Sequence, residues 1–214
     1  MNRFVSAWTV ISLITAGTCG LCGAAFARGT DDGDRSALLK GVQRLTAPGT
    51  IPGDIVVFGD NAFTVMTAPM GRANLPVIAA AQYEAGRVVV VGHEGFFGDT
   101  PLANADNAAL SVNMVEWLAG RTSKSVNVGL VGQSAGLAHV LSAAGAHVST
   151  VNVRDITGEL NRANDPVRVL WIDQAALDGE TRLIESVRKW VAKGGGLVVA
   201  GPGWGWASIP LRER

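Results

Sequence analysis

The residues best suited to chemistry in this sequence are His93 and Glu94, which follow the predicted strand 87–91 and Gly92. Zinc peptidases use such a pair, but they place a second histidine one helical turn later, so that both rings face one metal. Position 97 is Phe97, and the residues before His93 have the pattern of a strand. We therefore predict no metal site here. We expect a strand-end histidine that bonds to neighbouring backbone, or a pair that contacts a ligand at the end of the sheet.

A second candidate is Ser134, which lies between Gly132 and Gly136 where a strand pattern gives way to a helix pattern. This is the nucleophile-elbow arrangement, in which small neighbours permit the sharp turn that exposes the serine hydroxyl. The same turn could present free N–H groups to an anion. However, the loop lacks the lysine of a phosphate-binding loop and does not match G-x-G-x-x-G, so we expect no nucleotide and no other cofactor.

A serine hydroxyl is a weak nucleophile unless a base removes its proton. His139 would lie on the same helix as Ser134 but on a different face, and His147 would open the next strand at its far end. His93 could serve only if its strand lay beside strand 126–131 in parallel. A serine hydrolase using Ser134 and His93 is therefore the alternative, and a helix-capping serine is the simpler interpretation.

Trp204 and Trp206 stand in the most unusual stretch of the chain, a glycine-rich loop near its end. Two indoles separated by one residue can cover the end of a sheet, form a platform for a sugar, or join a protein interface. Together with Asp60, His93 and Glu94, they are the residues that we predict to contact a ligand.

The composition narrows the classes of partner. The 214 residues are 48% hydrophobic and 17% charged, with 18 basic and 18 acidic side chains. Such a chain can bury a substantial core. Its neutral balance, without clusters of lysine or arginine, argues against binding to nucleic acid or to an anionic membrane surface.

The first 27 residues have the pattern of an export signal. Arg3 provides the positive start, residues 4–21 are largely apolar, and small residues precede a predicted cleavage site after Ala27. An uncleaved membrane anchor is the alternative, because the apolar stretch approaches the ~20 residues that a membrane span needs. Cys19 and Cys22 both lie in this segment, so the predicted secreted or periplasmic product has no thiol, hence no disulfide and no cysteine nucleophile.

The remaining chain, 28–214, is predicted to form a single α/β domain in two parts. In residues 28–121 we expect a β-rich part, with helices at 34–45 and 107–118 and strands at 55–58, 63–67, 77–82 and 87–91. The last two of these strands should form an antiparallel hairpin. In residues 122–214 the pattern alternates, with strands at 126–131, 148–153, 167–172 and 197–200 and helices at 136–144 and 180–193. Fully apolar strands that alternate with helices predict a parallel sheet covered on both faces.

Four stretches, in their order and spacing, resemble one protein family. They are residues 51–63, 86–95, 113–118 and 194–208, and they are similar to the amino-terminal region of the TRP channel-associated factors and their bacterial relatives. The resemblance implies a flavodoxin-like fold of the class I glutamine amidotransferase type. In longer members this region precedes an enhancin-like zinc metallopeptidase domain that acts on mucin-type glycoproteins. These 214 residues offer no position for that domain's zinc ligands.

Amidotransferase chemistry requires a thiolate, which the predicted mature chain does not contain. The sequence therefore favours an exported, non-catalytic binding or accessory module whose ligand is a glycan or a protein. The serine hydrolase remains the alternative from a different functional class.

Overall fold

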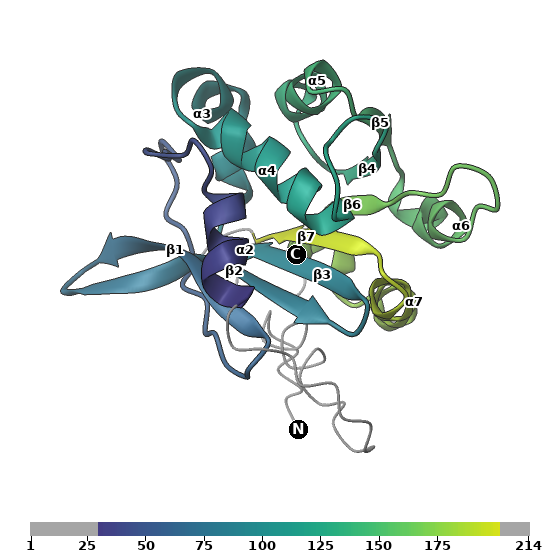
Figure 1. Ribbon diagram of the computed structural model, residues 1–214, viewed down its shortest axis with the longest axis horizontal. Coiled ribbons are helices and arrows are strands. Elements are labelled where there is room, and N and C mark those ends of the chain that lie inside the picture. The colour runs from purple at the N-terminus through teal and green to yellow at the C-terminus, as the bar shows by residue number, and fades with distance from the viewer. Residues whose placement is uncertain (1–29, 202–214) are drawn as a thin grey trace.

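The computed structural model describes residues 30–201, which form one seven-stranded sheet with helices on both faces (Figure 1). In space the strands follow the order β1-β2-β3-β7-β6-β4-β5. Their bounds are β1 (Ala62–Met70), β2 (Ala73–Tyr83), β3 (Gly86–Val91), β4 (Asn127–Val131), β5 (His147–Thr150), β6 (Val169–Asp173) and β7 (Gly196–Ala200).

The direction of the strands changes across the sheet. β1, β2 and β3 pair antiparallel, and β2 turns into β3 through the predicted hairpin, with Tyr83 opposite Gly86. From β3 onward every pairing is parallel. The fold is thus a mixed α/β sheet with an antiparallel start, which confirms the fold class expected from the sequence.

Two helical layers cover the sheet (Figure 1). The helices are α2 (Thr30–Leu38), α3 (Asp99–Asn104), α4 (Asn107–Ala119), α5 (Ala135–Ala143), α6 (Ile156–Leu160) and α7 (Thr181–Ala192), with short 3-10 turns η1 (Glu94–Phe97), η2 (Val153–Asp155) and η3 (Gln174–Leu177). Helices α2 to α5 lie on one face, and α6 and α7 on the other. Within β6, Trp171 belongs to the core on the α4 side, whereas Leu170 and Ile172 belong to the core on the α7 side. Because successive side chains of a strand alternate between faces, one apolar strand supplies both cores.

Close packing of α4 and α7 on β7 depends on glycines. A Cβ added at Gly196 would lie 2.7 Å from the Cβ of Leu118 in α4, and one at Gly195 would lie 2.4 Å from the indole of Trp190 in α7. Both separations are far below van der Waals contact. The glycine run after α7 therefore ends the helix and also lets both helical layers approach the central strand.

The first predicted helix, 34–45, is wrong at both ends, since α2 spans Thr30–Leu38. Beyond Leu38, helix α4 satisfies the backbone in place of a continuing helix. The Asn113 amide donates to the carbonyls of Leu38 and Lys40, at 3.0 and 2.8 Å. Gly41 then adopts a φ of +71°, which stops a right-handed helix.

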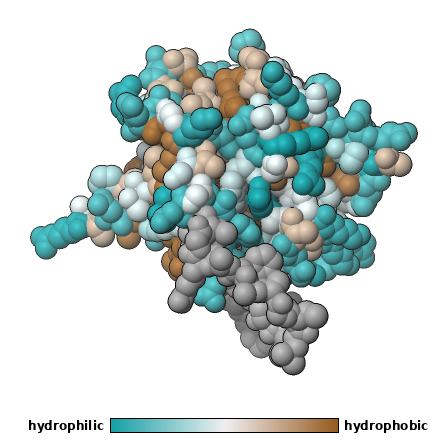
Figure 2. All heavy atoms as spheres, in the orientation of Figure 1, coloured by the Kyte–Doolittle hydropathy of each residue, from teal (hydrophilic) through white to brown (hydrophobic). Residues whose placement is uncertain are grey.

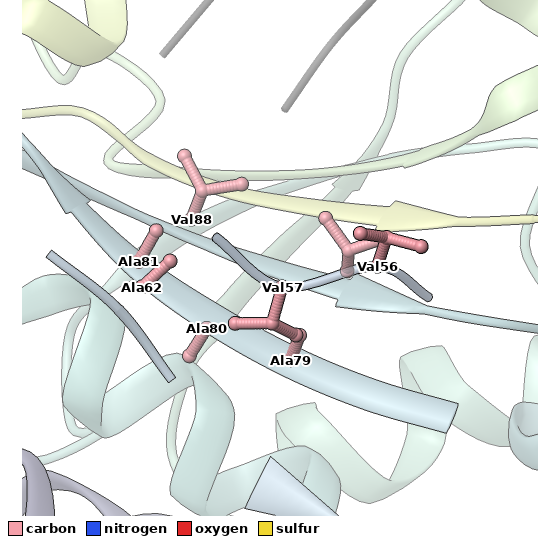
Figure 3. A pocket seen from close by; sticks show the side chains of 8 residues that line it. Val56, Val57, Ala62, Ala79, Ala80, Ala81 and Val88 are labelled. Atoms are coloured by element: carbon pink, nitrogen blue, oxygen red, sulfur yellow. The ribbon is translucent and has the colours of Figure 1, made fainter. Parts of the chain in front are cut away.

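The predicted strand at 55–58 is also wrong. Residues 51–58, called the strap below, form no strand and make isolated bonds instead. The Gly53 N–H donates to the carbonyl of Gly92, and the Ile55 N–H donates to that of Pro76, both at 2.8 Å. Val56 and Val57 then lie against β2 and β3 (Figure 3). The strap is apolar enough to resemble a strand, but its contacts cover the sheet rather than extend it.

The β1–β2 hairpin projects past the end of β3 (Figure 1). Its outermost pairing joins Met70 and Ala73, whereas β3 pairs with β2 only from Ile78 onward. The tip is hydrophilic on the face shown in Figure 2. Within residues 30–201, no helix has both the length and the apolar character needed to cross a membrane.

Candidate functional site

The carboxyl ends of β3, β7, β6 and β4 meet at one edge of the sheet, where α/β folds usually bind ligands. We call the residues that follow these ends the strand-end surface: His93 and Glu94, Gly201, Asp173 and Gln174, and 132–134. Two backbone hydrogen bonds hold the residues after β3 against the residue after β7. The Gly201 N–H donates to the carbonyl of Val91, and the Glu94 N–H donates to that of Gly201, both at 2.8 Å.

His93 caps the short turn η1. Its Nδ1 accepts the Gly95 N–H at 2.9 Å, so Nδ1 carries no proton in this arrangement. The same Nδ1 lies 3.3 Å from Oε2 of Glu94. Among residues 30–201, that oxygen meets no hydrogen-bond donor and is shielded from solvent, although the Glu94 side chain as a whole is 39% exposed. A buried polar atom without a hydrogen-bond partner is costly, which makes this pair an unusual feature of the strand-end surface.

The Ser134 hydroxyl makes two hydrogen bonds to the backbone, one as acceptor and one as donor. Its Oγ accepts the Leu137 N–H at 3.1 Å, which makes it the N-cap of α5, and donates to the Phe97 carbonyl at 2.9 Å. The strand of His93, β3, is separated from β4 by β7 and β6, which places the two strands roughly 14 Å apart. No hydrogen bond joins Ser134 to His93 in the part of the chain that the structure covers.

The amino terminus of α5 already has an anion. The Asp99 carboxylate accepts the Gly136 N–H at 3.1 Å, next to the N–H that Ser134 takes. A negative side chain at this end of a helix is favoured by the helix dipole. The N–H groups that an external phosphate would bind are therefore already bonded to side chains of the protein. Asp99 was missed in the sequence because it lies 37 residues from its partner.

The other two histidines stand apart from this surface. His139 is exposed on α5, and His147 opens β5 at its amino-terminal end, also exposed. Both positions match the geometry expected from the sequence.

Asp60 lies at the opposite edge of the sheet from His93. It sits in an exposed turn before β1, whose first residue pairs with Ala81 near the β2–β3 turn. His93, in contrast, follows the carboxyl end of β3, where Val91 pairs with Ile78. The structure therefore brings His93 and Glu94 together but leaves Asp60 away from them.

Trp204 and Trp206 lie outside the described residues. The segment that carries them begins after Gly201, whose carbonyl is bonded to Glu94.

Asp173 and Gln174 are strand-end residues that sequence reasoning did not select. Asp173 accepts the Ala175 N–H at 3.0 Å and caps η3. The Gln174 side chain lies close to Gly201: a Cβ added at Gly201 would lie 3.1 Å from Oε1 of Gln174. Their position at the end of an apolar strand was the available signal. Within residues 30–201, no three His, Cys, Asp or Glu side chains gather in a way that could hold a metal ion.

The larger pKa shifts lie away from this surface. Two backbone N–H donors, from Arg44 and Gln43, lower the pKa of Asp106. On α7, the hydrogen-bonded Arg188 guanidinium lowers the pKa of Glu185 to about 2. Both carboxylates serve structural contacts, one at the start of α4 and one on the surface of α7.

Comparison with solved structures shows where this fold also occurs. IMPa from Pseudomonas aeruginosa, in complex with an O-glycopeptide, superposes with a TM-score of 0.58 over 83% of this chain and 20% of that chain, at 18% identity. The IMPa metallopeptidase in complex with T-antigen gives a TM-score of 0.57 over 81% of this chain and 20% of that one, at 20% identity. The described sheet thus has the fold of part of a larger protein.

Sequence relatives define the family. Residues 24–212 match the family model described as "TRPM8, N-terminal domain". The chain is 32% identical over 173 residues to TRPM8 channel-associated factor 2 of Bos taurus and 33% identical over 173 residues to that of Homo sapiens, in each case covering 80% of this chain and 16% of the relative. It belongs to the family of amino-terminal domains of the TRPM8 channel-associated factors. The chain spans only about a sixth of the length of these relatives.

Proposed function

We propose that this chain is a non-catalytic binding or accessory module whose strand-end surface contacts a protein that carries O-linked glycans. The single observation that carries the non-catalytic part is the Ser134 hydroxyl. It is bonded to Phe97 and Leu137 rather than to an imidazole, so the best nucleophile in the sequence acts as a helix cap.

The sequence relatives and the structural neighbours both support a glycosylated protein as the partner. The relatives are named as channel-associated factors, which favours a protein partner. The IMPa structures hold an O-glycopeptide and T-antigen, which favours a glycan on that partner. An O-glycosylated polypeptide combines both chemistries.

The proposed contacts are His93 and Glu94 with Trp204 and Trp206. The Glu94 side chain is 39% exposed, and a carboxylate accepts hydrogen bonds from donors such as sugar hydroxyls. Indole faces stack well on the apolar faces of sugars. Asp60 is left out of this contact set because it lies at the other edge of the sheet.

We also propose that the chain is exported and acts outside the cytoplasm, because residues 1–27 have the pattern of a cleaved signal. Mass spectrometry of the exported product tests this directly. A mature amino terminus at Arg28 is expected, and retention of residues 1–27 would contradict it.

Binding to mucin tests the partner. Mucin is immobilised before and after enzymatic removal of its O-glycans, and wild-type protein is compared with Trp204→Ala/Trp206→Ala and with Arg182→Ala, a control on the exposed side of α7. We expect wild type and the control to bind native mucin, and the double variant to bind at least about ten-fold more weakly.

The two mucin samples separate the sources of affinity. Loss of binding to deglycosylated mucin identifies the glycan as the contact, and equal binding to both samples identifies the polypeptide. Failure of wild type to bind, or equal binding by the double variant, would contradict the proposed contacts.

A further inference from the structure

The connections that follow β4 and β6 leave the sheet toward opposite faces. These two strands are parallel neighbours, with Val131 paired to Ile172. After β4 the chain enters α5, whose Leu137 belongs to the core on the α4 side (Figure 1). After β6 it enters η3 and α7, whose Leu183 belongs to the core on the other side. Parallel α/β sheets usually bind ligands at such a switch point, where neighbouring connections diverge.

Gly132 and Asp173 lie side by side at the switch point. A Cβ added at Gly132 would lie 3.8 Å from the Cβ of Asp173. Gly132 has a φ of +70°, which residues with side chains rarely adopt. The glycine therefore leaves the side of Asp173 that faces β4 without a neighbouring side chain. Asp173 itself is partly exposed, at the end of a strand whose other residues are buried.

The side chains at the switch point have hydrogen-bonding capacity to spare. Asp173 uses Oδ1 to accept the Ala175 N–H, and Gln133 uses Nε2 to donate to the carbonyl of Val131. Within residues 30–201, the other oxygens of Asp173 and Gln133 and the side-chain amide of Gln174 form no hydrogen bond. A carboxylate and two amides supply both acceptors and donors. We call these residues the switch-point site: Gly132, Gln133, Asp173 and Gln174.

The charges at this end of the sheet disfavour an anionic ligand. The N–H groups of Gly136 and Leu137, at the start of α5, are already bonded to Asp99 and Ser134. The carboxylates of Asp99 and Asp173 would repel a further negative group. The switch-point site therefore suits an uncharged ligand that is rich in hydroxyl or amide groups.

We propose that the switch-point site binds an uncharged sugar of the partner's O-linked glycan. The Asp173 carboxylate accepts a hydrogen bond from a sugar hydroxyl, and the two glutamine amides bond to further hydroxyl or acetamido groups. Only β7 separates β6 from β3, so the end of β3 lies roughly 10 Å away and one glycopeptide can contact both places. This inference rests on the proposed function and adds to it the position and the charge of the sugar.

Removing one charge without changing the shape of the side chain tests the site in the full chain. Asp173→Asn keeps an oxygen that can accept the Ala175 N–H, so η3 stays capped. Asp178→Asn, at the other end of η3, is the matched control. The probe is a peptide with one threonine that carries O-linked N-acetylgalactosamine, and its affinity is measured by titration calorimetry. We expect Asp173→Asn to bind it at least about ten-fold more weakly than wild type and the control.

A sialylated form of the same glycopeptide tests the charge argument. Wild type should bind this form about five-fold more weakly than the neutral one, because Asp173 repels the added carboxylate. In Asp173→Asn the ratio of the two affinities should approach one. A purely structural role for Asp173 would weaken binding of both forms alike and leave the ratio unchanged, which would overturn the proposal.

A second variant guards against a change in folding. Gln174→Ala leaves the cap of η3 in place and should weaken binding of the neutral glycopeptide about five-fold. Affinities equal to wild type in both Asp173→Asn and Gln174→Ala would overturn the inference but not the proposed function. If wild type binds mucin but not the glycopeptide, the inference alone is wrong. If wild type binds neither, the proposed function is wrong as well.

Discussion

The hydroxyl of Ser134 donates a hydrogen bond to the carbonyl of Phe97 at 2.9 Å. Phe97 ends the turn η1 that follows β3, and Ser134 begins the helix that follows β4. One side chain therefore joins two loops of the strand-end surface that two strands separate. This bond fixes the edge at which we place the binding surface, and it uses the hydroxyl that a hydrolase would need free.

Replacing Ser134 with alanine should reduce stability through loss of the helix cap. We expect the free energy of unfolding, measured in urea, to fall by about 1–2 kcal/mol. Ser142→Ala, an exposed change in the same helix, should alter it by less than about 0.5 kcal/mol.

A fluorophosphonate probe should leave the wild-type protein unlabelled. Labelling that disappears in Ser134→Ala would restore the serine hydrolase alternative.

Removing Asp99 should loosen the start of α5, because its carboxylate accepts the Gly136 N–H. Asp99→Ala is expected to cost about 0.5–1 kcal/mol of unfolding free energy at low ionic strength. Asp99→Asn keeps an acceptor without the charge, and should lie between wild type and the alanine variant. Equal stability of all three proteins would show that the carboxylate contributes nothing there.

Adding a methyl group at Gly196 should be costly, since it would lie 2.7 Å from the Cβ of Leu118. Gly196→Ala is expected to lower the free energy of unfolding by about 1–3 kcal/mol through overpacking. Gly158→Ala is the matched control, because α6 leaves open space at that position. It should be neutral or stabilise by up to about 1 kcal/mol. A neutral Gly196→Ala would contradict the close packing of α4 on β7.

The attachment of residues 39–45 to α4 should weaken in acid. The pKa of Asp106 lies below its ordinary value of 3.8 because its carboxylate accepts two backbone N–H groups. A depressed pKa means that this contribution to stability is present above pH 3.8 and is lost as the pH falls through the lowered value. The difference in unfolding midpoint between wild type and Asp106→Asn should be constant from pH 6 to 5 and shrink below about pH 4. A difference independent of pH down to 2 would contradict this.

Local patterns in the sequence predicted the sheet well, and long-range contacts decided what they missed. The alternation of apolar strands and amphipathic helices from residue 126 onward determines the parallel half, because each segment has a strong period of its own. The strap has the same apolar composition as a strand, but its partners, Gly92 and Pro76, are distant in sequence. The early end of α2 depends on Asn113, 73 to 75 residues away.

The candidate site shows the same division. Proximity in sequence placed His93 beside Glu94, and the strand pattern placed Ser134 at the start of a helix. Only the order of the strands shows that β7 and β6 separate them. The same order brings Gly201 next to Glu94 and leaves Asp60 at the far edge, which no local pattern encodes.

The most direct test of the binding surface is a hydrogen-exchange footprint of the full chain with and without mucin O-glycopeptide. We expect slower exchange of the amides of Glu94 and Gly201, with little change along the exposed strand β5. Slowing confined to β5 or α6, with the amides beside His93 unaffected, would contradict the assignment of binding to the end of β3.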